Sequence, residues 1–156
     1  MPSNFEEQLA LCYEDLDYTP AVLKKLPLFF EQASFFIKEN NISVQCYLHV
    51  GDIVLINSDE EECIAIIRAI FCHKKGERYL TFIIIDSFKN INQTKLVCPV
   101  YRLATNNLRK IFPVSIVKSV NAIHFIHNCK DGECIEGNYN LENDLYIKNL
   151  YFFKAV

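Results

Sequence analysis

Residues 63–88 read CIAIIRAIFCHKKGERYLTFIIIDSF, and this stretch decides the fold. Two runs rich in β-branched and aromatic residues, 63–72 and 79–85, flank the polar segment 73–77. Such runs are typical of strands, and Gly76 supplies the positive φ that a tight turn requires. We therefore predict an antiparallel hairpin in the middle of the chain.

The sequence pattern of this hairpin continues on both sides of it. Short apolar and aromatic runs recur between polar turns, and the acidic run 59–62 marks another hairpin turn. Many short strands joined by tight loops are typical of a barrel or a sandwich. We therefore predict a mainly β body over 43–156, whose further strands span 43–49, 52–56, 95–101, 115–120, 122–128 and 145–153.

Residues 1–42 instead favour a helical lead. One helix is expected near 5–13. A second is expected to begin with Thr19 as N-cap before Pro20 and to break or kink at Leu26-Pro27. It is expected to continue over 27–40, where Phe29, Ala33, Phe36 and Ile37 follow the i, i+4, i+7, i+8 spacing of a buried stripe. The stripe predicts that this helix covers a face or an open edge of the body. The alternative is that it binds a helix of a partner.

Composition limits the classes of function. A chain of 156 residues with 51% hydrophobic content fits one compact domain. No apolar run reaches 18 residues, and the start lacks a secretory signal, so we expect an intracellular protein without membrane contact. A net charge of −3 with dispersed Lys and Arg removes the strongest argument for direct nucleic-acid binding. Seven cysteines, an odd number, argue against a disulfide framework.

One local cluster has the chemistry of a metal site. Along an extended strand His127 and Cys129 project to the same face, and the turn-forming segment 130–133 returns Cys134 close to Cys129. Three such ligands on one side of a turn suit a structural zinc ion, which needs a fourth. His73 is the first choice for the fourth ligand, with Cys72 as the alternative and Cys98, His49 and His124 behind them. Reduced thiols without metal, or a Cys129–Cys134 disulfide, are the competing interpretations.

The same cluster gives a poor catalytic centre. Cys129 or Cys134 as nucleophile would need His127 as base and Asn128 to orient it, but adjacent strand residues point to opposite faces. The sequence also lacks a phosphate-binding loop and the usual hydrolase and metalloprotease motifs. We expect no catalysis, no small-molecule substrate and no cofactor besides zinc.

From about residue 47 to 155, the order of the segments resembles a bromo-adjacent homology domain, a distorted β-barrel module of chromatin proteins. The resemblance implies this barrel, and the apolar stripe of the N-terminal helical extension predicts that the extension packs on it. The segments that carry it are Val50-Gly51-Asp52-Ile53-Val54, Ala65-Ile66-Ile67-Arg68-Ala69-Ile70-Phe71, Tyr79 to Asp86, Phe112-Pro113-Val114-Ser115-Ile116-Val117, Ala122 to His127, and Asp144-Leu145-Tyr146 through Tyr151-Phe152.

The chain departs from this family where members read methylated lysine. It has no Trp, and residues 82–88 lack the family's aromatic triplet and acidic end. Tyr79, Phe88 and Tyr101 could supply rings, but strand aromatics usually pack in a core. The resemblance therefore implies only a protein-interaction module of a chromatin- or nucleic-acid-associated protein, nuclear rather than cytoplasmic. The alternatives are a structural accessory domain of a larger polypeptide, or direct nucleic-acid binding. The His-x-Cys-x4-Cys ending is similar to domains of mobile-element proteins.

Overall fold

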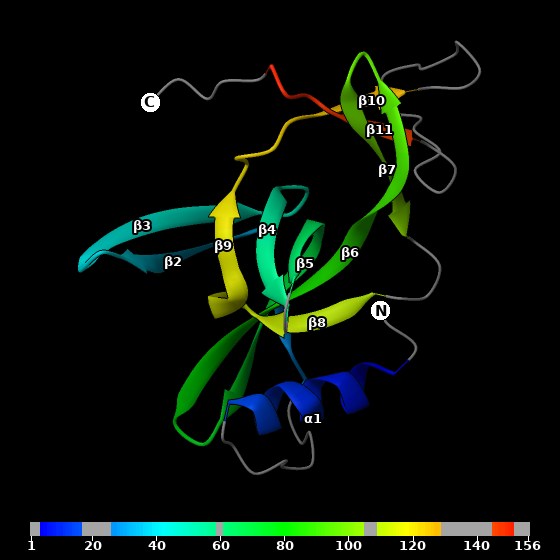
Figure 1. The fold of residues 1–156 in the computed structure, drawn as a ribbon. Helices are drawn as coiled ribbons and strands as arrows, with labels where there is room; N and C mark the ends of the chain where they lie inside the picture. Colours follow the sequence, from blue (N-terminus) through cyan, green and yellow to red (C-terminus); the bar gives the residue numbers. More distant parts are fainter. Residues whose placement is uncertain (1–3, 17–25, 59–60, 105–108, 129–144, 152–156) are drawn as a thin grey trace.

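The computed structural model describes residues 4–16, 26–58, 61–104, 109–128 and 145–151 (Figure 1). Within these ranges the chain is mainly β, as predicted. The elements are α1 (Phe5–Asp15), β1 (Leu28–Phe30), β2 (Gln32–Glu39), β3 (Ile42–His49), β4 (Ile53–Ser58), β5 (Glu61–Lys75), β6 (Arg78–Lys95), β7 (Cys98–Ala104), β8 (Lys110–Pro113), the 3-10 turn η1 (Val114–Ile116), β9 (Val117–Val120), β10 (Phe125–Asn128) and β11 (Leu145–Lys148).

The predicted central hairpin is confirmed and is longer than expected. β5 and β6 pair antiparallel from Ala65↔Ser87 to Lys75↔Arg78, and Gly76 adopts a φ of +61° in the turn. The ladder shifts register between Ile67 and Ala69, which leaves Arg68 outside the pairing. A β-bulge of this kind bends a strand and redirects a side chain.

On the edge that faces away from the hairpin, each of its two strands pairs with two further strands. β5 pairs with β4 over its first half and with β1 near its end, whereas β6 pairs with β8 over 82–85 and with β7 over 87–95. The sheet therefore forks along β6, and Asp86 occupies the point where β7 and β8 diverge. The main path runs β10-β11-β7-β6-β5-β4-β9.

The two faces of the hairpin bury different clusters. One face contributes Ile67, Ile70, Ile83 and Ile85 to a core shared with β3, β4 and β9. The opposite face packs against α1 at one end and against β10 and β11 at the other. Phe71 and Phe82 stack beneath α1 with ring centroids 5.4 Å apart. Burial of each such side chain is worth roughly 1.5–3 kcal/mol.

Helix α1 confirms the first part of the helical lead and docks on the free edge of β8. The side-chain amide of Gln8 donates to the carbonyl oxygen of Arg109 at 3.0 Å and accepts from the N–H of Ile111 at 3.0 Å. The Cys12 thiol donates to the carbonyl oxygen of Ile111 at 3.1 Å. The helix thus satisfies backbone groups that a neighbouring strand would otherwise satisfy.

The predicted helix over 27–40 is wrong. This segment forms β1 and β2, and β2 pairs with β3 in a separate two-stranded sheet, the β2–β3 arm. Alternation competes with the helical spacing, because Ala33, Phe35 and Ile37 face one side as a strand requires. Asn40 and Asn41 then take φ values of 48° and 65°, which suit a tight hairpin turn.

The nine-stranded sheet has two ends, because β10 and β9 lie at opposite ends of the pairing order. The strands are not closed into a barrel by pairing within the described residues. The segment β8-η1-β9 runs from the edge of β6 to the edge of β4 and covers the core between them. Among the described residues, no helix has the length and apolar character needed to cross a bilayer.

Candidate binding surfaces

The predicted zinc ligands are only partly described. His127 lies on β10, where its ring packs against Tyr146 with centroids 5.3 Å apart. Cys129 and Cys134 fall outside the described residues. No group of three His, Cys, Asp or Glu side chains within the described ranges is placed to hold a metal ion.

His73, the first choice for the fourth ligand, lies elsewhere. It is buried near the end of β5, and its Nδ1 forms a hydrogen bond with the hydroxyl of Tyr13 on α1. Strands β6, β7 and β11 separate β5 from β10, and α1 and β10 lie at opposite ends of the sheet (Figure 1). The structure therefore does not bring His73 to His127.

The remaining choices for the fourth ligand are also engaged or distant. The thiol of Cys72 contacts Thr81 Oγ1 at 3.3 Å on the same end of β5 as His73. Cys98 is buried, and Nδ1 of His49 lies 3.5 Å from Asp52. His124 is the nearest of them to His127 in sequence, and its Nδ1 lies 3.4 Å from Asn149 Nδ2.

The aromatic residues that a methyl-lysine reader would need do not form a cage. Phe88 stacks on Phe125 with centroids 4.4 Å apart, and Tyr101 meets Phe125 edge to face at 5.4 Å. Tyr146 completes this packing against Phe88. Tyr79 lies apart from them, on the turn side of the hairpin, where the ammonium of Lys74 is 5.5 Å from its ring. These rings pack in or on the sheet, as the sequence favoured.

The β2–β3 arm projects from the body and carries large exposed apolar side chains (Figure 1). Phe36 and Tyr47 are 65% and 63% exposed and lie as diagonal neighbours on its outer face. Ile42 and Val44, 64% and 51% exposed, lie toward the tip on the opposite face. Both faces of the arm thus expose large apolar side chains, and gathered exposed apolar side chains often mark an interaction site.

A groove of about 490 Å³ separates the arm from β9. Its apolar lining comes from Ile37 and Val44 on the arm and from Val120 on β9. β9 pairs with β4 on one side, and no second strand pairs with it within the described part of the chain. The outer edge of β9 therefore faces the groove with backbone groups available for a further strand.

A polar cluster fixes the base of this groove. The carboxylate of Asp52 accepts from the N–H of His49 at 2.7 Å and from the side-chain amide of Asn121 at 2.9 Å. The amide oxygen of Asn121 in turn accepts from the N–H of Ile53 at 3.1 Å. Gly51, at a φ of +95°, permits the turn between β3 and β4. These contacts tie the arm to β9.

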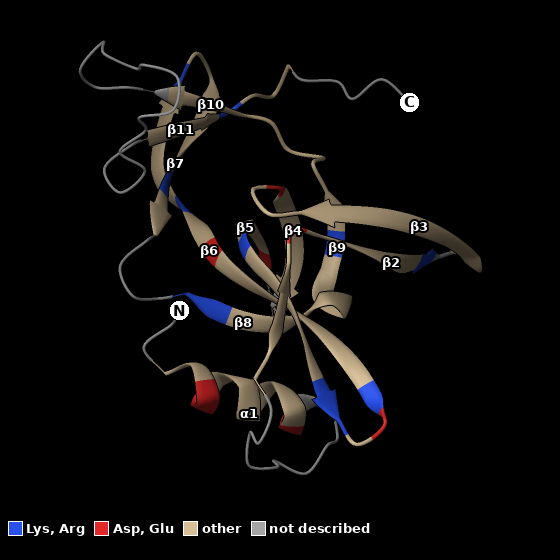
Figure 2. Cartoon of the chain, turned by 180° about the vertical axis from the view of Figure 1, so that it is seen from behind, with Lys and Arg blue, Asp and Glu red and all other residues tan. Residues whose placement is uncertain are grey.

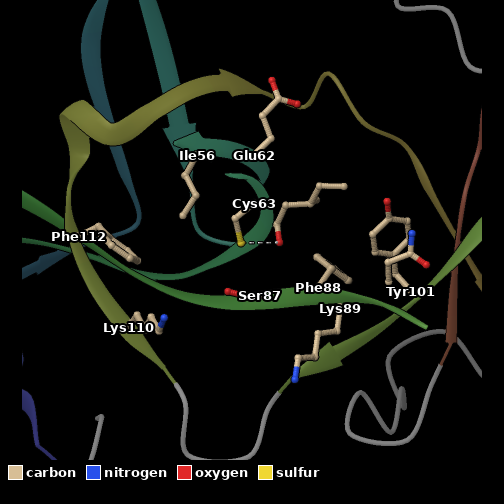
Figure 3. A pocket seen from close by; sticks show the side chains of 11 residues that line it. Ile56, Glu62, Cys63, Ser87, Phe88, Lys89, Tyr101, Lys110 and Phe112 are labelled. Atoms are coloured by element: carbon tan, nitrogen blue, oxygen red, sulfur yellow. Dashed lines mark hydrogen bonds between the residues drawn. The ribbon is translucent and has the colours of Figure 1, made fainter. Parts of the chain in front are cut away.

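A second hollow, of about 570 Å³, opens at the fork between β7 and β8 (Figure 3). Its walls hold Ile56, Ile64, Phe88, Tyr101 and Phe112, which come from five strands. Cys63 and Ser87 line the inner part, and the Cys63 thiol lies 3.7 Å from the carbonyl oxygen of Ile64. We call this hollow the fork cleft.

The fork cleft is bordered by cations. Lys89 and Lys110 lie on the side opposite Glu62 in Figure 3. Lys89 also stands directly across the ladder from Arg102, and like charges in this position repel. None of these three cations forms an ion pair within the described residues. Basic residues on the β6–β7 ribbon and at the start of β8 are visible in Figure 2.

Glu62, the acidic residue of the cleft lining, is already paired with a cation. Its carboxylate accepts a hydrogen bond from Lys118 at 2.5 Å, and Figure 3 shows it turned away from Lys89 and Lys110. The hydrogen bond and the charge of Lys118 hold the pKa of Glu62 below its ordinary value. The Glu62–Lys118 pair forms the ridge between the fork cleft and the arm groove, since Lys118 lines the groove.

Sequence reasoning missed both hollows. In the sequence the Lys and Arg residues look dispersed, because nothing in the local sequence shows that β7 and β8 share one edge of β6. The only signal was the break in the hydrophobic run at Asp86 and Ser87. Comparison with known proteins adds no assignment: no family profile, no curated protein and no solved structure matches the chain.

Proposed function

We propose that this chain is a non-catalytic protein-interaction module that binds a partner through the β2–β3 arm and the open edge of β9. The observation that carries the proposal is the exposure of Phe36, Tyr47, Ile42 and Val44 on one projecting ribbon. A two-stranded ribbon is marginally stable in water by itself. Its exposed apolar residues therefore gain most when a partner covers them.

The open edge of β9 suggests how the partner binds. An extended segment that entered the arm groove would pair its backbone with β9 and place alternate side chains against Ile37, Val44 and Val120. Backbone pairing supplies affinity in such strand additions, and the side-chain pockets supply specificity. A structural accessory domain, the main alternative, has no need of either feature.

The biological setting in this proposal rests on the sequence. The resemblance to bromo-adjacent homology domains supports a chromatin- or nucleic-acid-associated protein in the nucleus, with a distorted barrel as its fold. The His127, Cys129 and Cys134 cluster supports a structural zinc near β10. His73 is no longer part of that zinc proposal.

Site-specific photo-crosslinking tests the interaction. A benzophenone amino acid replaces Tyr47 on the arm or Tyr79 on the central hairpin, which are 63% and 61% exposed. The chain is irradiated in a lysate of cells that produce it naturally. Discrete protein adducts at position 47, absent at position 79, are expected. Equal labelling at the two positions, or no adduct at position 47, would contradict the proposal.

A further inference from the structure

We propose that the fork cleft is a separate binding site for an acidic, extended protein segment, in which a carboxylate binds between Lys89 and Lys110. The inference stands on the cleft and does not require the arm to bind anything. A volume of about 570 Å³ lies within the range of about 300–1,000 Å³ that is typical of ligand pockets, and it could hold several atoms of a peptide backbone with one or two side chains.

Charge complementarity selects an anion. Lys89 and Lys110 border the cleft, and Arg102 opposes Lys89 across the ladder. Lys89 and Arg102 face each other, Lys110 adds a further positive charge at the cleft, and none of the three has an acidic partner among the described residues, so a bound carboxylate would offset this charge. Glu62 offers little competition, because Lys118 already holds it on the opposite rim.

The apolar walls favour a ligand with an apolar group next to its carboxylate. Phe112 and Tyr101 line the cleft on opposite sides and are half-buried, whereas Ile56 is buried in the core behind them (Figure 3). An aliphatic or aromatic side chain next to the carboxylate would displace water from Phe112 and Tyr101. Ser87 and Asn90 add a hydroxyl and an amide that suit the backbone of an extended segment.

An acidic peptide fits these features better than nucleic acid. Single-stranded nucleic acid is bound by open aromatic platforms and a continuous track of cations. Here Phe88 is 7% exposed, and its ring is stacked on Phe125 within the sheet. The net charge of −3 also opposes a polyanion of high charge density, whereas two lysines suffice for one or two carboxylates.

Binding of short peptides tests the site. Fluorescence polarisation compares a labelled eight-residue peptide containing three Glu around one Leu with the same peptide carrying Gln in place of Glu. The acidic peptide is expected to bind at least tenfold more tightly than the Gln peptide, and its affinity should fall as the salt concentration rises. Equal binding of the Gln peptide, or no binding of the Glu peptide at millimolar concentration, would overturn the inference.

Variants locate the binding. The double variant Lys89→Met, Lys110→Met should lower the affinity for the acidic peptide at least tenfold. The control Lys38→Met, which replaces an exposed lysine on β2, should leave this affinity unchanged. Phe36→Ser with Tyr47→Ser should leave peptide affinity unchanged, so failure of the arm proposal and failure of this one are distinguishable. Competition by an oligothymidylate at lower concentration than the peptide would reassign the cleft to nucleic acid and overturn the inference.

Discussion

The buried carboxylate of Asp86 lies 2.7 Å from Nε of Arg68 across the register shift of the central hairpin. The same carboxylate lies 3.3 Å from Nε of Arg109, immediately before β8. Asp86 is fully buried, whereas Arg68 and Arg109 are partly exposed. The bulge at Arg68 and the fork of the sheet therefore meet at one charge cluster, which fixes the start of β8 and with it Lys110.

Asp86→Ala should destabilise the protein. Removal of one partner from a buried ion pair costs roughly 3–5 kcal/mol, and the lower end is expected because both guanidinium groups reach solvent. Urea unfolding followed by circular dichroism measures the loss. Glu77→Ala, in the exposed turn of the same hairpin, serves as the control and should change the free energy of unfolding little. A loss below about 1 kcal/mol for Asp86→Ala would contradict the role of this carboxylate.

Gln8→Ala should loosen helix α1 from the sheet. It removes the acceptor for the Ile111 N–H and the donor for the Arg109 carbonyl, and an unsatisfied buried backbone group costs about 1–3 kcal/mol. Gln8→Glu keeps the acceptor for the Ile111 N–H but loses the donor, so its exchange rate at the Ile111 amide should lie between those of the natural chain and Gln8→Ala. Gln32→Ala, on the exposed face of the arm, is the matched control. Hydrogen exchange of the Ile111 amide reports the change directly, and an unchanged exchange rate in Gln8→Ala would count against the docking described above.

Glu62 should titrate below its ordinary value of 4.5 because Lys118 stabilises its charged form. A lowered pKa stabilises the folded state above the ordinary pKa, and the contribution is lost as pH falls through the folded value. Carboxyl-carbon NMR measures the titration. Lys118→Met should raise the pKa of Glu62, and Lys38→Met should leave it unchanged. A Glu62 that titrates normally in the natural sequence would exclude the ion pair.

Purified protein should contain about one equivalent of zinc if the cluster near β10 binds metal. Cys129→Ser or Cys134→Ser should remove it. Cys72→Ser should retain it, because Cys72 lies beside Thr81 at the far side of the sheet from His127. Metal analysis by mass spectrometry decides the matter. A folded, metal-free protein would exclude the zinc site, and loss of zinc in Cys72→Ser would contradict the strand order.

The central hairpin and the β-rich character were predictable because they depend on local patterns. Runs such as 79–85 favour strands wherever they lie, and Gly76 marks the turn. The arm was mispredicted because the helical spacing of Phe29, Ala33, Phe36 and Ile37 overlaps with a strand alternation that runs through Ala33, Phe35 and Ile37. Pairing with β3 across the Asn40-Asn41 turn decides between helix and strand there.

The binding surfaces were harder to predict than the strands. The fork cleft exists because β7 and β8 share one edge of β6, so Lys89 and Lys110 become neighbours of one hollow through tertiary pairing alone. His73 illustrates the converse. Its residue type suits zinc, but its strand places it against Tyr13. Residue type predicts chemistry, and only topology decides which groups meet.

The arm proposal is tested most directly by the affinity of a crosslinked partner, once it is identified by mass spectrometry and purified. Isothermal titration compares the natural chain with the Phe36→Ser, Tyr47→Ser double variant and with Tyr79→Ser. The double variant should bind at least tenfold more weakly, a loss of about 1.4 kcal/mol or more, while Tyr79→Ser binds normally. Equal affinity of the double variant and the natural chain would contradict the account.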